Sequence, residues 1–433
     1  MVTRVSALLP SGEAIDLEVT PEMTGWELKE QIKTRQPWDE PTSSTTGVEI
    51  IIDGMLLAGD ENCVDAGIAE DAVLSIVFKT NFVICSNQDV VASLGGVIDY
   101  YDPKEPLLAV EIPSDETRIL EGAFAGCYAL AKLTIPDSVT HIGDRAFQEC
   151  DSLRSLTIPN SVTHIVESAF SGCSSLKNLT ISDSVTHIEK SAFAGCSALA
   201  NLHIPNSVIH IKSDAFAGCS SLENLNISDS VTLMGDGAFE YCTSLVSLTI
   251  PHSVTRIENC AFSGCSSLAN LTIAGSVTRI GNSAFSSCES LMTLTIPNTV
   301  AYIGDAAFEH CSGLVGLTIP DTVTYIGERA FLNCTSLVSL TIPNSVTRIR
   351  HYAFWNCSSL VNLTIPDSLI GIENAAFKNC SSLVSLTVPD SVTRIGDGAF
   401  QGCSSLVLRV SLSKTKSGRE AFAGCKDLIA KES

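Results

Sequence analysis

The chain has 433 residues, 45% of them hydrophobic, and a formal net charge of −22. Its length exceeds what one ordinary globular core uses, so more than one structural unit is expected. The negative charge argues against nucleic acid or an anionic membrane surface as the main partner, and the sequence has no apolar run long enough for membrane insertion.

The first ten residues contain no uninterrupted apolar stretch, and the carboxylates Asp16 and Glu18 follow them. We therefore identify no signal peptide. The chain has 17 cysteines, and without a secretion signal these favour reduced thiols, as in the cytosol or nucleus. The sequence thus predicts an intracellular protein, cytoplasmic or nuclear.

Residues 1–80 are predicted to form a small α+β domain, in which two strands are followed by a helix and two more strands. Thr24 can cap the helix, and Glu27, three residues later, can complete a capping box. The predicted elements are a hairpin over 5–19 with its turn at 10–12, a helix over 24–34, and strands over 48–52 and 73–78.

This order resembles a ubiquitin-like β-grasp domain, and the resemblance rests on residues 15–19, 49–54 and 72–78. No Gly-Gly pair follows the last strand, so conjugation through a C-terminus is not expected. The resemblance implies an apolar surface that docks receptors of ubiquitin-like folds, and it maps to Leu9, Ile51 and Val77. The alternative is that these three are ordinary strand residues, partly in the core.

Residues 81–106 are predicted to connect this domain to the rest of the chain. The segment contains the apolar pairs Val83-Ile84 and Val90-Val91. We therefore expect it to pack as an N-terminal cap over the open edge of the first repeat.

From residue 107 onward the sequence is periodic. A cysteine recurs every 23 residues from Cys127 to Cys403, with a phenylalanine three residues before it and a leucine three residues after it. A fixed period of this length is typical of a solenoid, in which each unit buries its apolar side only by stacking on its neighbours.

One repeat, residues 334–357, shows how each unit should fold. Leu337, Leu340 and Ile342 form a Leu-x-x-Leu-x-Ile segment, and its last part alternates apolar and polar residues, which predicts a strand with one buried face. Pro343 then ends the strand, because proline cannot donate to a sheet. A second short piece, extended or helical, should follow before the next cysteine.

This pattern resembles the leucine-rich repeats of the BspA-like (Treponema-type) class, through its Leu-x-x-Leu-x-Ile-Pro, Ser-Val-Thr-x-Ile and Ala-Phe-x-x-Cys stretches. The resemblance implies a curved leucine-rich-repeat solenoid with a parallel β-sheet on its concave face, and a role in adhesion or protein recognition. We assign residues 107–406 to these repeats. Residues 407–433 lose the proline and one residue of spacing, so we assign them to a degenerate last repeat and C-terminal cap.

The cysteine row is predicted to be structural. A line of single thiols about 4.8 Å apart does not converge on a metal ion, and an apolar interior raises a thiol pKa instead of activating it. The sequence also contains no phosphate-binding glycine loop and no nucleophile motif. We therefore predict no enzyme activity, no cofactor and no metal.

A second row carries histidine at one repeat position. Stacked imidazoles could bind a metal or sense pH. The same position then accepts Leu, Arg and Tyr, which favours a solvent-facing, permissive site. The row comprises His141, His164, His187, His210, Leu233, Arg256, Arg279, Tyr302, Tyr325 and Arg348.

Two departures from the regular strand surface are candidate protein-binding sites. One interrupts the threonine row with other polar residues, at Asn201, His203, Asn224 and Asn226. The other is an exposed apolar line at the start of successive strands, Val315, Val338, Val361 and Val384. The alternative for the valines is β-propensity with incidental packing.

These features predict a non-enzymatic scaffold or adaptor, with a ubiquitin-like docking head and a solenoid that binds a second protein. A cell-surface or secreted adhesin and a self-associating structural solenoid are the alternatives. We expect a monomer whose partners are proteins, without nucleic acid binding or membrane insertion.

Overall fold

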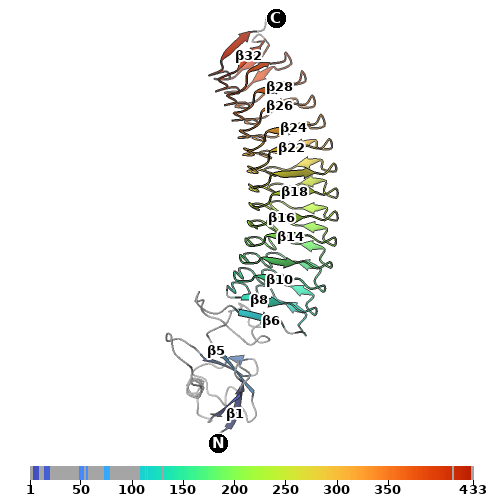
Figure 1. Cartoon of the computed structure of the whole chain (residues 1–433), viewed down its shortest axis with the longest axis vertical. Helices are drawn as coiled ribbons and strands as arrows, with labels where there is room; N and C mark the ends of the chain where they lie inside the picture. The colour runs from blue at the N-terminus through green and yellow to red at the C-terminus, as the bar shows by residue number, and fades with distance from the viewer. Residues whose placement is uncertain are drawn as a thin grey trace. The chain divides into compact units, whose positions relative to one another are not determined.

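The computed structural model describes the strand residues 3–8, 14–19, 48–52, 55–56 and 73–78, and then residues 108–430 apart from 113, 115, 129, 412 and 413. The chain forms two compact units, Met1–Leu153 and Arg154–Ser433 (Figure 1). The predicted helix over 24–34, the connector over 81–106 and Leu9 lie outside the described residues.

The first unit contains a five-stranded sheet of order β2-β1-β5-β3-β4. β1 pairs antiparallel with β2 and parallel with β5, and β3 pairs antiparallel with both β4 and β5. Strands therefore occur in each segment for which the sequence predicts them. Ile51 lies in β3 and Val77 in β5, and their side chains are outside the described part. The strands are β1 (Thr3–Leu8), β2 (Ala14–Val19), β3 (Val48–Ile52), β4 (Met55–Leu56) and β5 (Val73–Phe78).

The same unit also holds the first two repeats of the periodic region. Each contributes one longer strand and one two-residue strand, and equivalent strands pair in parallel. The rings of Phe124 and Phe147 stack with centroids 5.0 Å apart. The strands are β6 (Leu108–Glu111), β7 (Arg118–Ile119), β8 (Leu130–Thr134) and β9 (His141–Ile142).

The second unit is a stack of repeats in two strand columns (Figure 1). The first column is β10 (Ser155–Thr157), β12 (Asn178–Thr180), β14 (Asn201–His203), β16 (Asn224–Asn226), β18 (Ser247–Ile250), β20 (Asn270–Ile273), β22 (Thr293–Thr295), β24 (Gly316–Thr318), β26 (Ser339–Thr341), β28 (Asn362–Thr364), β30 (Ser385–Thr387), β32 (Val407–Val410) and β34 (Asp427–Ala430). The second column is β11 (His164–Ile165), β13 (His187–Ile188), β15 (His210–Ile211), β17 (Leu233–Met234), β19 (Arg256–Ile257), β21 (Arg279–Ile280), β23 (Tyr302–Ile303), β25 (Tyr325–Ile326), β27 (Arg348–Ile349), β29 (Gly371–Ile372), β31 (Arg394–Ile395) and β33 (Lys416–Ser417).

Pairing within each column is parallel, and as far as β30 and β31 the paired residues are 23 positions apart; at the C-terminal end the separation falls to 22 and then 20. Ser155 is opposite Asn178 in the first column, and His164 is opposite His187 in the second. The second piece of each repeat is therefore extended. Between residues 108 and 430, the part of the solenoid that the structure describes contains no helix.

Alternation along the strands builds the core. In β26, Ser339 and Thr341 face solvent while Leu340 is buried. The Ala-Phe-x-x-Cys stretch of each repeat adds fully buried residues, and its phenylalanine rings form one continuous stack. From Phe170 to Phe400 neighbouring centroids are 5.3 to 5.6 Å apart with near-parallel planes. The stack explains why phenylalanine keeps the same period as cysteine.

The loop that closes each repeat contains two residues in the left-handed region, such as Ser168 (φ 54°) and Gly172 (φ 79°). The Gly172 amide donates to the Ala194 carbonyl of the next repeat at 2.7 Å, so the loops are also hydrogen-bonded along the stack. Cys260, which the sequence suggests is a packing residue, takes the first of these positions in its own repeat (φ 53°) and is half-buried.

At the C-terminal end, β34 pairs with β32, and all four of its residues are exposed. Two of them, Leu428 and Ile429, are large and apolar. A capping repeat should carry a polar outer face. The capping role of residues 407–433 therefore stays a prediction.

We expect Phe285→Ala to lower the free energy of unfolding by about 3–5 kcal/mol, because it removes a fully buried ring and leaves a cavity. Phe285 stacks on Phe262 at 5.6 Å and on Phe308 at 5.4 Å. Urea unfolding followed by circular dichroism measures the change. The control, Met292→Ala, truncates a side chain that is 61% exposed and should change the value by less than about 0.5 kcal/mol. Equal effects of the two changes would contradict a core built on the phenylalanine stack.

Candidate protein-binding surfaces

An apolar line runs along the first column, at the residue just before each strand. We call Met292, Val315, Val338, Val361 and Val384 the apolar ridge. The exposed fractions are 61% for Met292, 41% for Val338 and 52% for Val384. Val361 was predicted to be exposed like the others and is instead half-buried. The line ends at Val384, because Val407 is paired with Ser385 as the first residue of β32.

Backbone hydrogen bonds hold the ridge at the spacing of the stack. The Val315 amide donates to the Met292 carbonyl at 2.8 Å, and the Val361 amide donates to the Val338 carbonyl at 2.9 Å. Successive ridge side chains are therefore fixed one strand spacing, about 4.8 Å, apart. A partner would meet a preorganised row with little conformational entropy to lose.

Among the described repeats, large apolar side chains follow one another at this position only from Met292 onward. Val246, in an earlier repeat, is 47% exposed but lies between Glu223 and the small Ala269. The same position carries the exposed charges Arg154, Lys177 and Glu223 in the early repeats. Polar strand residues such as Ser339 and Asn362 lie beside the ridge and are exposed. An apolar stripe with a polar margin is typical of a protein contact surface.

The structure brings together the four residues of the polar interruption. The Asn224 amide Nδ2 donates to Asn201 Oδ1 at 2.8 Å, and Asn226 Nδ2 lies 3.4 Å from His203 Nδ1. All four side chains are exposed on β14 and β16. The pairs leave these groups accessible to a partner.

The outward residues of the second column stack on each other, whereas the sequence favoured a permissive position and suggested stacking only for the histidines. His164 and His187 stack at 4.7 Å, and Tyr302 and Tyr325 stack at 4.6 Å. Arg279 lies over the Tyr302 ring at 4.1 Å. The position faces outward as expected, but its central members are half-buried, because in-register strands place rings of successive repeats face to face.

The histidine stack should make stability depend on pH. Burial lowers the pKa of His187 below its ordinary 6.5, and charge on His164 and His210 lowers it further; Lys212 also lowers it, and Glu189 opposes the shift. The unfolded chain therefore binds this proton more readily than the folded chain does. Stability should be insensitive to His187 above pH 6.5 and should fall as the pH drops from 6.5 to the lowered pKa.

Urea unfolding at pH 7.5 and 5.5 measures this effect. We expect His187→Gln to reduce the loss between the two pH values. His252→Gln, at an exposed histidine outside the stack, should leave the loss unchanged. Identical losses in both variants and the parent chain would contradict the assignment to His187.

The cysteine row has a structural function that the sequence did not reveal. From Cys196 to Cys403, each thiol of the row donates to the carbonyl of a phenylalanine in the preceding repeat, as from Cys196 Sγ to Phe170 O at 3.4 Å and from Cys311 Sγ to Phe285 O at 3.3 Å. Burial raises the pKa of Cys311 to about 12. Such thiols are protonated and poor nucleophiles. None of the cysteines that the structure describes forms a disulfide.

The described residues contain no group of three or more His, Cys, Asp and Glu side chains that could hold a metal ion. In the histidine row, the Thr186 hydroxyl lies 2.8 Å from His187 Nδ1 and occupies that nitrogen. No helix long and apolar enough for a bilayer occurs among the same residues. The exposed rows of the two columns have side chains in fixed positions that a protein partner could contact.

Sequence comparison matches the chain to the family described as BspA type Leucine rich repeat region, in 6 copies over residues 100–219, 186–315 and 307–429. No curated protein sequence matches significantly. Two solved structures are similar. A leucine-rich repeat protein from Bacteroides ovatus is 32% identical with a TM-score of 0.69, covering 73% of this chain and 85% of that one. A leucine rich cell surface protein from Faecalibacterium prausnitzii is 30% identical with a TM-score of 0.50, covering 70% and 88%.

Proposed function

The chain belongs to the family of BspA-type leucine-rich repeat proteins, and from this membership we propose that it is a non-enzymatic binding protein of the adhesin type, which acts at a cell surface or after secretion. Its partner would be another protein, held by the exposed rows of the solenoid. The fold alone does not define a function, so the proposal depends on the surface that the repeats present.

The apolar ridge carries the proposal. Val338 is 41% exposed and Val384 52%, although both precede strands whose outward residues are serine and threonine. A row of exposed aliphatic groups at fixed spacing gains free energy when a partner removes it from water, about 25 cal/mol for each Å² buried. The same position carries charged residues in the early repeats, so this surface changes from charged to apolar along the stack.

The similarity to a leucine rich cell surface protein from Faecalibacterium prausnitzii supports a surface location over the intracellular one that the cysteine content suggested. The structure offers a physical reason to discount the cysteine count. Buried thiols that hydrogen-bond between repeats serve the core, and they are protected from oxidants by burial. Their number therefore carries little information about the redox compartment.

An impermeant biotin reagent applied to intact producing cells tests this proposal. We expect the chain to be labelled before lysis, and a chemical crosslinker on the same cells to join it to a second protein. Labelling only after lysis would contradict the surface location. A chain that is fully labelled but never crosslinked to another protein would contradict the binding role.

An adaptor with a ubiquitin-like head is the second candidate. The order β2-β1-β5-β3-β4, with its first and last strands parallel at the centre, supports it, because such a sheet needs a crossover where the sequence predicts a helix. Affinity capture with the full chain and with a chain lacking residues 1–80 separates the two candidates. An unchanged set of partners would contradict the adaptor.

Self-association through the ridge is the remaining alternative. Sedimentation of the full chain over a range of concentrations distinguishes it. We expect a monomer at micromolar concentration. Reversible assembly that V338K and V384K abolish would assign the ridge to a second copy instead.

A further inference from the structure

Gly371 interrupts the outward row of the second column. It pairs with Arg348 on one side and Arg394 on the other. Neighbouring strands lie about 4.8 Å apart, so the two arginine backbones flank a gap about two strand spacings wide, and no side chain fills it. The result is a hollow of about 250 Å³, which we call the Gly371 notch, and its lining includes Arg348, His351, Ile370, Gly371, Glu373 and Arg394.

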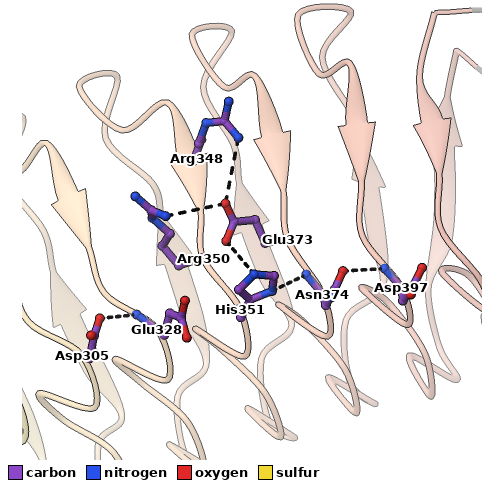
Figure 2. A network of polar contacts seen from close by, with 8 residues as sticks. All are labelled: Asp305, Glu328, Arg348, Arg350, His351, Glu373, Asn374 and Asp397. Carbon is purple, nitrogen blue, oxygen red and sulfur yellow. Dashed lines mark hydrogen bonds and ion pairs between the residues drawn. The ribbon is translucent and has the colours of Figure 1, made fainter.

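Glu373 forms one wall of the notch and is held by three basic groups (Figure 2). Its Oε1 lies 4.0 Å from Arg348 Nη1 and 3.9 Å from Arg350 Nη1, and its Oε2 lies 3.3 Å from His351 Nε2. The backbone N–H of Asn374 donates to His351 Nδ1 at 3.1 Å, which places the imidazole proton on Nε2, toward Glu373. The carboxylate is therefore fixed in place and its side chain is only 18% exposed.

The opposite wall is Arg394, an exposed guanidinium that makes no ion pair with any residue between 108 and 430 that the structure describes. Arg348 and Arg394 together outweigh the single charge of Glu373, so the notch is positive on a chain whose net charge is −22. Ile370, 44% exposed, adds an apolar surface to the lining.

We propose that the Gly371 notch binds a carboxylate of the partner protein, from an acidic side chain or a chain terminus. A carboxylate is planar and singly charged, and it can accept hydrogen bonds from guanidinium groups on either side. A dianionic phosphate would meet stronger repulsion from the fixed Glu373 carboxylate. Ile370 would contact the aliphatic part of the residue that carries the ligand. This inference rests on the proposed function, since it supplies a polar anchor besides the ridge.

A substitution at Gly371 can fill the notch without unfolding the chain. A Cβ built on Gly371 meets nothing closer than the Arg394 carbonyl oxygen at 3.8 Å, and the backbone is not left-handed there. Tyrosine already occupies the same repeat position at Tyr302 and Tyr325. Gly371→Tyr should therefore fold and fill the gap.

Fluorescence anisotropy on the full chain tests the proposal, with rhodamine-labelled peptides as probes. One probe is Gly-Leu-Glu-Leu-Gly-amide and its control has Gln for Glu; a second pair, Gly-Leu-Leu-Gly-Leu with a free or an amidated C-terminus, tests the other source of the carboxylate. We expect at least one carboxylate probe to bind about tenfold more tightly than its neutral control. The pair that shows the difference identifies the source.

Gly371→Tyr and Arg394→Ala should each remove that difference. The control Arg256→Ala changes an arginine at the same repeat position that pairs with Glu258 at 3.5 Å, and it should leave the difference intact. The ridge variant V338K/V384K should also bind the probes normally, so a failed ridge and a failed notch are distinguishable. Equal binding of charged and neutral probes, an unchanged difference in Gly371→Tyr, or stronger competition by inorganic phosphate than by acetate would overturn the proposal.

Discussion

A chain that carries both V338K and V384K should bind its protein partner at least about 100-fold more weakly than the parent chain. Val338 is 41% exposed and Val384 52%, so a partner that covers the ridge must bury both sites. Each lysine would place an unpaired ammonium group in an apolar contact, which costs about 2 kcal/mol or more even after partial hydration. The two sites are two repeats apart, so their effects should nearly add.

The fold should tolerate these changes, because Lys177 occupies the same repeat position naturally. Thermal unfolding of the variant should match that of the parent chain. The matched control is Glu223→Lys, which puts a lysine at the same position in an early repeat, away from the ridge. Surface plasmon resonance with the captured partner should give parent-like affinity for this control. Parent-like affinity of V338K/V384K would contradict the ridge as the contact surface.

The second large effect is a loss of stability in alkali. Burial raises the pKa of Cys219, Cys265, Cys311 and Cys357 to about 12, from an ordinary value of 9.0. The folded chain therefore keeps these protons while the unfolded chain releases them. The thiols contribute their full stabilisation below pH 9, and this is lost as the pH rises from 9 through 12.

Each such thiol should remove up to about 1.4 kcal/mol of stability per pH unit between pH 9 and 12, so the four together make the solenoid unfold within a narrow alkaline range. Melting temperatures at pH 8, 9 and 10 measure the slope. The triple variant C265A, C311A and C357A should start less stable at pH 8, because it loses three buried hydrogen bonds, yet should decline less steeply. Parallel declines of the variant and the parent chain would contradict thiol ionisation as the cause.

The repeat architecture could be predicted from the sequence because every buried row has the same period. Phenylalanine and cysteine at fixed positions set the register, and that register identified Leu340 as buried and Val338 as exposed. The same register places Met292 and Val246 at the ridge position, but the prediction named only the four later valines and left both out. The half-burial of Val361 depends on local packing that a period does not encode.

Interactions between repeats were harder to predict. The bond from Cys311 Sγ to Phe285 O joins a side chain to a backbone atom 26 residues earlier, so it follows from the three-dimensional stack and not from a motif. The Gly371 notch exists because one repeat has no side chain at the outward position. The repeat pattern consists of residues that recur, so it does not indicate a position where a side chain is missing. Aligning Gly371 with Arg348 and Arg394 would have supplied the signal.

Site-specific photo-crosslinking tests the central claim, that the apolar ridge holds a protein partner. A photo-crosslinking amino acid is placed in the full chain at position 338, on the ridge, or at position 177, the equivalent site in an early repeat. The ridge probe should crosslink to the partner in high yield and the early probe should not. Crosslinking mainly from position 177, or equally from both, would contradict the ridge as the binding surface.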